Sequence, residues 1–182
     1  MTPQSHFLTS WIIANREKQF RKCEYWLVIG SGLFPDIDGF GYPFEYFTRG
    51  TKCELNWYTQ YHHLLLHGIL GFAIVAAVSY LICRRTKIVS LCLFAFSLHL
   101  VCDLIGSGGP ENENWPLILF WPISNVEFTV SWQWPLSSFY NTTIVFVFEI
   151  VMIVLLIRRK YSPISLISES WDKRVLGIFK IT

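Results

Sequence analysis

The sequence predicts an all-α integral membrane protein with about three full transmembrane helices, an N-terminal half-spanning helical hairpin and a C-terminal amphipathic helix. Of the 182 residues, 52% are apolar and only 15% are charged, and the charged residues are largely excluded from three long apolar windows. Many Trp and Tyr residues flank these windows, as they do in the aromatic belts of membrane proteins. The net charge of +2 gives no reason to expect nucleic acid as a partner.

The length favours one membrane-embedded helical domain over residues 1–160, followed by a tail over residues 161–182. The first 40 residues contain two apolar arms, 7–14 and 25–34, that are too short to cross a bilayer. A basic tip, residues 15–22, separates them, so we expect a half-spanning hairpin.

The polar, aromatic residues 39–60 are expected to form a loop, and the three spans to cover residues 64–83, 88–105 and 139–157. The apolar segment 115–123 carries two prolines, which favours a surface-lying or re-entrant segment over a span. The tail alternates apolar and polar faces with helical spacing, as in an interfacial amphipathic helix.

Basic clusters predict how the chain is oriented. Residues 84–87 and 158–160 are rich in Arg and Lys, as is the hairpin tip at 16–22, so all three are expected on the cytoplasmic side. The start of the first span, the end of the second span and the turn at residues 35–38 then face the other side. We therefore expect a multi-pass protein of the inner membrane whose polar intrusions lie toward the extracytoplasmic face.

Those intrusions are histidines and aspartates at helical spacing. His63 and His67 are four residues apart, as are His99 and Asp103, so each pair is expected to share a helix face. On a regular helix His62 points well away from His67. Ionisable groups inside a membrane are costly and usually functional.

Two carboxylates, Asp36 and Asp38, end the second arm of the hairpin, and folding the hairpin returns His6 to their level. Imidazole nitrogens and carboxylate oxygens from separate helices are the ligands of a di-metal site, and this mixture suits Zn, Mn or Fe better than Ca or Mg. Such a centre activates water and holds phosphate oxygens. The simpler alternative is a set of polar residues that satisfy one another inside a bundle, but the convergence of several such residues favours metal.

Two other functions remain open. In a metal or proton transporter, His67, His99, Asp103 and Glu149 would form a path across the membrane, but below His99 only Glu149 and Ser90 continue it. Glu149 lies about 15 Å from the outer end of its span, near mid-bilayer, where a proton path and a simple hydroxyl partner are equally compatible with its position. A membrane assembly protein without catalytic activity is the third possibility.

The order of these motifs resembles that of the YdjM-like bacterial inner-membrane proteins, which are described as metal-dependent hydrolases. The resemblance covers residues 1–160, which it marks as a hydrolase-like domain, and includes the Trp121–Ser124 turn. That family is similar to zinc-dependent phospholipases C and single-strand nucleases, which use a helical multi-zinc site on phosphodiesters. Carried over by position, the resemblance implies seven ligands: His6, Asp36, Asp38, His62, His67, His99 and Asp103.

The resemblance thus selects His62 where helical spacing selects His63, and it makes His63 a phosphate contact. We expect two ions, of which Zn is preferred. From the depth of the site and the type of metal we expect a phosphoester substrate such as a phospholipid or lipid-linked phosphate reached from the bilayer. Two positions depart from the family pattern: Gly39 stands where His is common, and Gly68 where Ser or Asn is expected. The residues assigned to catalysis are Asp36, Asp38, His63 and Asp103.

Overall fold

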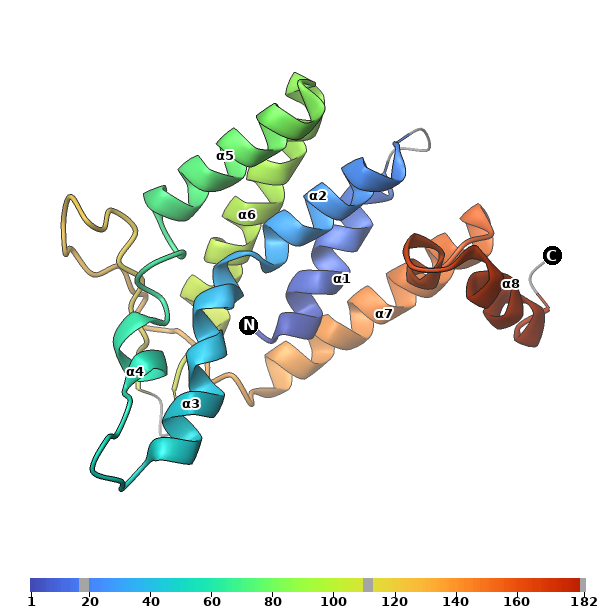
Figure 1. The fold of residues 1–182 in the computed structure, drawn as a ribbon. Helices are drawn as coiled ribbons and strands as arrows, with labels where there is room; N and C mark the ends of the chain where they lie inside the picture. Colours follow the sequence, from blue (N-terminus) through green and yellow to red (C-terminus); the bar gives the residue numbers. More distant parts are fainter. Residues whose placement is uncertain (17–19, 110–112, 181–182) are drawn as a thin grey trace.

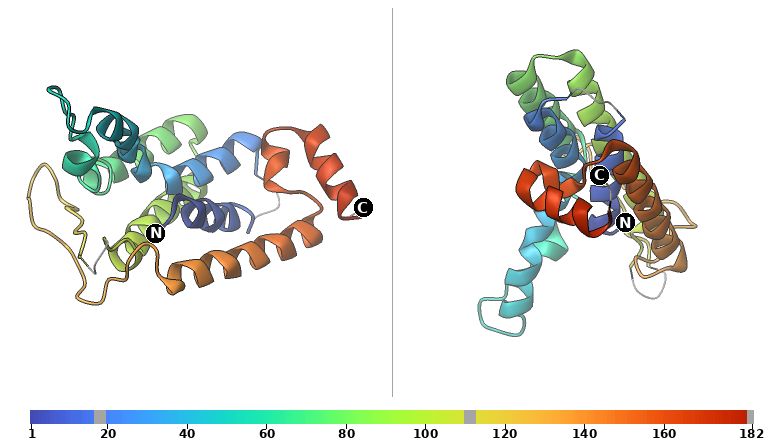
Figure 2. Two further views of the ribbon diagram at one scale, coloured as in Figure 1. Left: turned by 90° about the horizontal axis from the view of Figure 1, so that it is seen from below. Right: turned by 90° about the vertical axis from the view of Figure 1, so that its right-hand side faces the viewer.

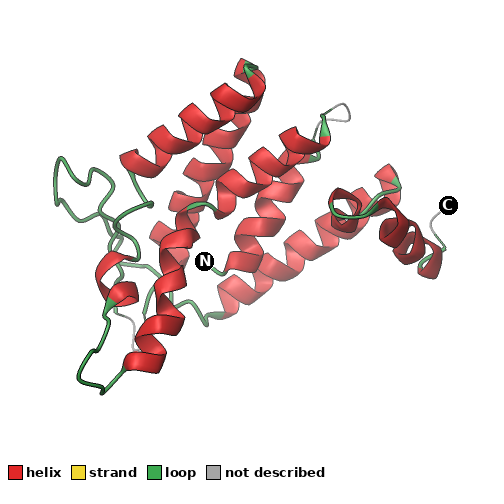
Figure 3. Cartoon of the chain, viewed as in Figure 1, coloured by secondary structure: helices red, strands yellow, loops and turns green. Residues whose placement is uncertain are grey.

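The computed structural model describes residues 1–16, 20–109 and 113–180, and the regular structure in these ranges is helical, with two isolated β-bridges in place of strands (Figure 1, Figure 3). The helices are α1 (Pro3–Ala14), α2 (Lys22–Leu33), η1 (Pro35–Phe40), α3 (Gly41–Thr48), α4 (Trp57–Tyr61), α5 (Ile69–Cys83), α6 (Thr86–Gly106), α7 (Phe139–Arg159), η3 (Pro163–Leu166) and α8 (Glu169–Ile178). The all-α prediction is confirmed.

The N-terminal hairpin consists of α1 and α2, each of 12 residues. Each arm is about 18 Å long, well short of the roughly 30 Å hydrocarbon core of a bilayer. The arms approach closely at Gly32, where an added Cβ would lie 1.8 Å from Ser10 Oγ. Both helices pack against α6, so the hairpin is fixed to a longer helix.

Two helices of the described chain, α6 and α7, are long and apolar enough to cross a membrane, each with 21 residues. The predicted first span is shorter than expected: α5 has 15 residues and begins at Ile69, because residues 62–68 form a non-helical turn. The count of three full spans is therefore not confirmed. Only 11% of the apolar window of α7 is buried, whereas a core helix of a soluble protein is mostly buried.

Residues 39–60 are not the loop that we predicted. They contain the end of η1 and the short helices α3 and α4, and α3 extends away from the bundle (Figure 2). Glu45 joins the two helices, since its carboxylate accepts hydrogen bonds from the backbone N–H of Thr59 at 2.9 Å and from its hydroxyl at 2.6 Å. These two hydrogen bonds join residues 14 positions apart, so local composition does not predict them.

The basic segments gather at one end of the bundle, away from the N-terminus (Figure 1). Arg85 there donates to buried Glu24 at 2.7 Å, and the Arg159 guanidinium donates to the carbonyl of Arg16 at 3.3 Å. Residues 17–19 of the basic tip lie outside the described residues, as do residues 181–182 of the tail.

The rest of the tail forms η3 and α8. Trp171 and Ile178 of α8 are exposed, while Asp172 is buried and accepts the backbone N–H of Ser162 at 2.8 Å. The tail is thus held partly by a polar contact within itself.

The structure gives Glu149 a partner. Its carboxylate accepts a hydrogen bond from the side-chain amide of Gln4 at 2.7 Å, which links α7 to α1. The partner is therefore an amide rather than a hydroxyl.

Candidate metal centre

The turn between α4 and α5 gathers three imidazoles. His62, His63 and His67 each offer a ring nitrogen within 4.8 Å of those of the other two. His63 has a φ of 67°, in the left-handed region that non-glycine residues rarely adopt. The helical face that we predicted for His63 and His67 is therefore wrong, although the turn brings both side chains, and His62 with them, to one place.

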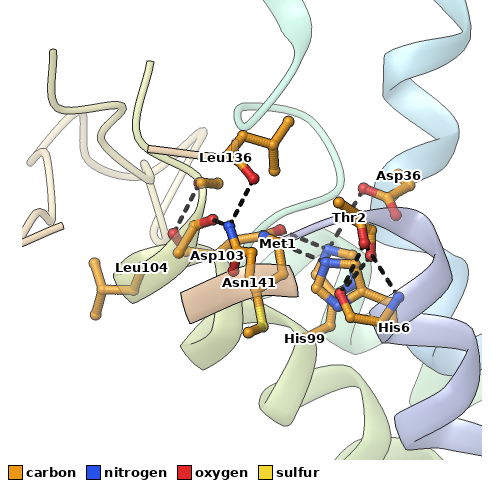
Figure 4. A network of polar contacts seen from close by, with 12 residues as sticks. Met1, Thr2, His6, Asp36, His99, Asp103, Leu104, Leu136 and Asn141 are labelled. Atoms are coloured by element: carbon orange, nitrogen blue, oxygen red, sulfur yellow. Dashed lines mark hydrogen bonds and ion pairs between the residues drawn. The ribbon is translucent and has the colours of Figure 1, made fainter. Parts of the chain in front are cut away.

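A second donor group forms where the hairpin meets α6. It consists of His6 from α1, Asp36 from η1, and His99 and Asp103 from α6, again with one ligand atom of each within 4.8 Å of the others. His99 Nε2 lies 2.8 Å from Asp103 Oδ2, and His6 Nε2 lies 3.1 Å from Asp103 Oδ1. Figure 4 shows His6, His99 and Asp36 converging. The predicted sharing of a face by His99 and Asp103 is confirmed.

The two donor groups adjoin through His67. Its Nε2 lies 3.3 Å from His99 Nε2 and 3.5 Å from Asp103 Oδ2. All three side chains are buried. Ions bound in the two groups would thus be neighbours, as in two-metal hydrolases.

The outer nitrogens of these imidazoles are already engaged with oxygen atoms. Asp38 lies 2.8 Å from His62 Nδ1 and 3.1 Å from His67 Nδ1, and the carbonyl oxygen of Gly32 lies 2.8 Å from His99 Nδ1. Because a carboxylate and a carbonyl only accept, each Nδ1 carries the proton and each Nε2 is left as a free donor for a metal. A carboxylate or carbonyl behind a ligating histidine is the usual outer shell of metal sites.

Asp38 therefore lies behind the imidazoles, outside both donor groups. Burial raises the pKa of its carboxyl, but the hydrogen bonds from His62 and His67 outweigh burial and lower that pKa to about 2. Asp38 is ionised at neutral pH and holds both rings in one orientation. Burial lowers the pKa of His63 well below its ordinary value, so that ring is neutral.

Two features of this arrangement call for a cation. In the neutral tautomers set by Asp38 and Gly32, His67 Nε2 and His99 Nε2 would both be acceptors facing each other at 3.3 Å beside the Asp103 carboxylate. Burial lowers the pKa of His67, but its hydrogen bonds to Asp103 and Asp38 outweigh burial and raise that pKa to about 9, so a proton occupies this place when no metal does. Among the described residues, the buried Oδ2 of Asp36 also has no hydrogen-bond partner. Donors arranged in this way repel one another unless a cation lies between them, so the residues present fit a bound metal.

Two cavities reach the donor groups. One, of about 570 Å³, is lined by Asp36, His62, His63 and Asp103 and by apolar residues of the hairpin such as Leu33. This volume falls within the range of about 300–1,000 Å³ found for small-molecule sites. The other, of about 330 Å³, also borders His62 and His63. His63 faces both, which suits the role of substrate contact that the resemblance implies.

Sequence reasoning missed several supporting residues. The ring of Tyr58 stacks on His62 with centroids 4.5 Å apart, and Trp115 lines both cavities. The Gln133 amide donates to the carbonyls of Asp103 and Trp115, at 3.1 Å in each case. The N-terminal amine of Met1 contacts Asp103. These contacts join distant parts of the chain, and no local pattern signals them.

Fold and site together define a helical membrane protein with two adjoining His/Asp groups that can hold metal ions. The chain belongs to the YdjM inner membrane protein family, whose sequence model matches residues 1–174. The resemblance that the motif order predicts is thus confirmed, and it extends beyond residue 160 into the tail. Comparison with curated proteins and with solved structures gives no match.

Position 39 offers a direct test of the donor geometry. A Cβ added at Gly39 would lie 3.4 Å from Nδ1 and Cε1 of His62, which is ordinary contact. Gly39→His would therefore place a further imidazole beside this group, and we expect metal affinity to rise about tenfold, a change of the size that neighbouring groups exert on metal sites. Titration of the apo-protein with Zn²⁺ measures it. Gly177→His, at an open position of α8, is the control. Equal affinities in the two variants would contradict the assignment.

Proposed function

We propose that this protein is a membrane-bound, metal-dependent hydrolase of phosphoesters. The observation that carries the proposal is the pair of Nε2 atoms of His67 and His99, which face each other at 3.3 Å beside a buried carboxylate. One divalent transition-metal ion, Zn or else Mn or Fe, would be held by His6, Asp36, His99 and Asp103. A second would be held by the imidazoles of the turn, with His62 and His67 as ligands.

When bound, such ions supply an activated water and hold phosphate oxygens. The chain's own residues do the rest. Asp38 fixes the orientation of His62 and His67, and Asp103 contacts the ligands of both groups. His63, neutral and outside the group around Asp103, donates to or accepts from a phosphate in the adjoining cavities.

The membrane setting is part of the proposal. We infer that α6 and α7 cross the inner membrane and that the basic end of the bundle lies in the cytoplasm, following the positive-inside rule. The donor groups then lie toward the extracytoplasmic face. The apolar walls of the larger cavity, Leu33 and Ile37 among them, favour a phospholipid or a lipid-linked phosphate as the substrate.

A transporter is a weaker alternative. A path for ions or protons needs polar groups from one face to the other, and Glu149, the charged group nearest mid-span, is paired with Gln4 between α1 and α7. A non-catalytic assembly protein would use the same His/Asp groups as structural metal sites, and turnover separates it from a hydrolase.

The test is elemental analysis of the protein in mild detergent after Zn²⁺ or Mn²⁺ is supplied, followed by assay on bis(p-nitrophenyl) phosphate. We expect about two ions per chain and metal-dependent hydrolysis, with His67→Ala and Asp36→Asn both losing metal and turnover. A wild-type protein that binds no metal would refute the proposal. Two bound ions without turnover on any phosphoester would favour the assembly protein.

A further inference from the structure

An apolar groove of about 260 Å³ runs between α2 and α5. Leu27 and Gly30 line it from α2, Phe34 lines it from the residue after α2, and Ile74 and Val78 line it from α5. The hydroxyls of Ser31 and Ser79 border the groove, but each donates a hydrogen bond to a carbonyl of its own helix at 2.6 Å and needs no partner from a ligand. The groove thus offers hydrocarbon contact and little else.

This groove adjoins the cavity of the metal centre. Gly30 and Ile37 line both, so these two residues separate the groove from the cavity that contains Asp36 and His62. Val78 and Trp26, beside the groove, are 43% exposed on the apolar outside of the bundle. In a membrane protein this surface meets lipid tails, so the groove opens toward them.

Gly30 lies between the groove and the cavity. A glycine inside a helix costs about 1 kcal/mol relative to alanine, so its presence in α2 needs a reason. Close helix packing is not the reason, because a Cβ at this position would meet nothing within 4 Å. Two residues later Gly32 shows the contrast, since a Cβ there would overlap Ser10. The absence of a side chain at Gly30 leaves open space between the groove and the cavity.

We propose that the α2–α5 groove binds the apolar chain of a lipid whose phosphate lies at the donor groups. The ligand class is an amphiphile with one long chain, acyl or prenyl, attached next to a phosphate. The phosphate end of this inference rests on the proposed function; the chain end rests on the groove alone. The chain enters sideways from the bilayer, so the phosphate reaches the metal centre without the lipid leaving the membrane.

The test uses two photoactivatable lipids with a diazirine in the chain, one a lysophosphatidic acid and the other a polyprenyl phosphate, on metal-free protein in nanodiscs. We expect labelled peptides from α2 and α5 with at least one of the probes, and the more strongly labelling probe identifies the chain type. Gly30→Leu would displace two or more methylenes of the chain and reduce labelling at least about tenfold. Gly177→Leu, the same change at an open helical position of α8, keeps it.

Val78→Phe narrows the groove from the α5 wall and is a second, independent test in case Gly30→Leu does not fold. The folding of both variants is checked by thermal unfolding. Labelling confined to other helices, or equal labelling of the two Gly→Leu variants, overturns the inference whether or not the protein is a hydrolase. Groove labelling in a protein that hydrolyses no phosphoester refutes the proposed function and leaves the lipid site standing.

Discussion

Asp103→Asn is expected to remove both metal ions and to lower phosphoester hydrolysis by at least about 10³-fold. The Asp103 carboxylate is buried and lies 2.8 Å from His99, 3.1 Å from His6 and 3.5 Å from His67, so it contacts ligands of both donor groups. An amide has the same shape but neither the charge nor the second free acceptor. Metal-ion stabilisation amounts to several kcal/mol of the barrier, and each 1.36 kcal/mol is a factor of ten in rate.

Elemental analysis and turnover measure this effect, and the matched control is Asp172→Asn. Asp172 is also a buried aspartate whose carboxylate accepts hydrogen bonds, but it lies in α8 and binds Ser162. We expect that variant to lose some stability and to keep its metal. Retention of two ions by Asp103→Asn would mean that the carboxylate only accepts hydrogen bonds from the histidines around it.

Gly68→Ser is expected to destabilise the protein by about 1–3 kcal/mol, the usual cost of overpacking. A Cβ at position 68 would lie 2.4 Å from the carbonyl oxygen of Leu119 and 2.8 Å from its carbonyl carbon. Both are backbone atoms, which cannot rotate away as a side chain does. The same carbonyl accepts the N–H of Ile69 at 2.8 Å, so relief of the overlap breaks the bond that begins α5.

The effect reaches the metal centre because His67 is the preceding residue. For a chain of this length each kcal/mol corresponds to about 2–4 °C in Tm, so thermal unfolding detects the change. The metal content of the turn should fall in parallel. Gly177→Ser, at an open position, is the control. An unchanged Tm would contradict this prediction, because it would show that the backbone at Leu119 moves away from the added side chain at little cost. Glycine at position 68 thus leaves room for the Leu119 backbone.

Elements with a long apolar period were predictable, and so was the gathering of His and Asp residues in one place. The ends of α6 and α7 lie within two residues of the ends of the predicted apolar windows. The hairpin was predicted from two short apolar arms on either side of a basic tip. The donor residues were found because ionisable groups stand out in apolar sequence. His99 and Asp103 meet as helical spacing requires, because the helix that carries them is regular.

The turn at residues 62–68 was not predictable. Leu64, Leu65 and Leu66 continue the apolar run and favour helix, but the backbone there bonds to a distant segment: Ile118 N–H points to the carbonyl of His63 at 3.5 Å. That contact and the one at Leu119 hold a positive φ at His63. Tertiary bonds outweigh local propensity at this point, which is why spacing selected His63 while the structure gathers His62 as well.

The hairpin has arms too short to be held by the bilayer as a spanning helix is, yet it carries His6 and Asp36, while α6 carries His99 and Asp103. Any ion held by these four residues ties the inserted hairpin to its neighbour. By mass action, an ion present at a thousand times its Kd would stabilise the docked hairpin by about 4 kcal/mol. Metal supply would then govern the fraction of chains in which the hairpin is docked on α6, and the site would stabilise the fold as well as provide a place for chemistry.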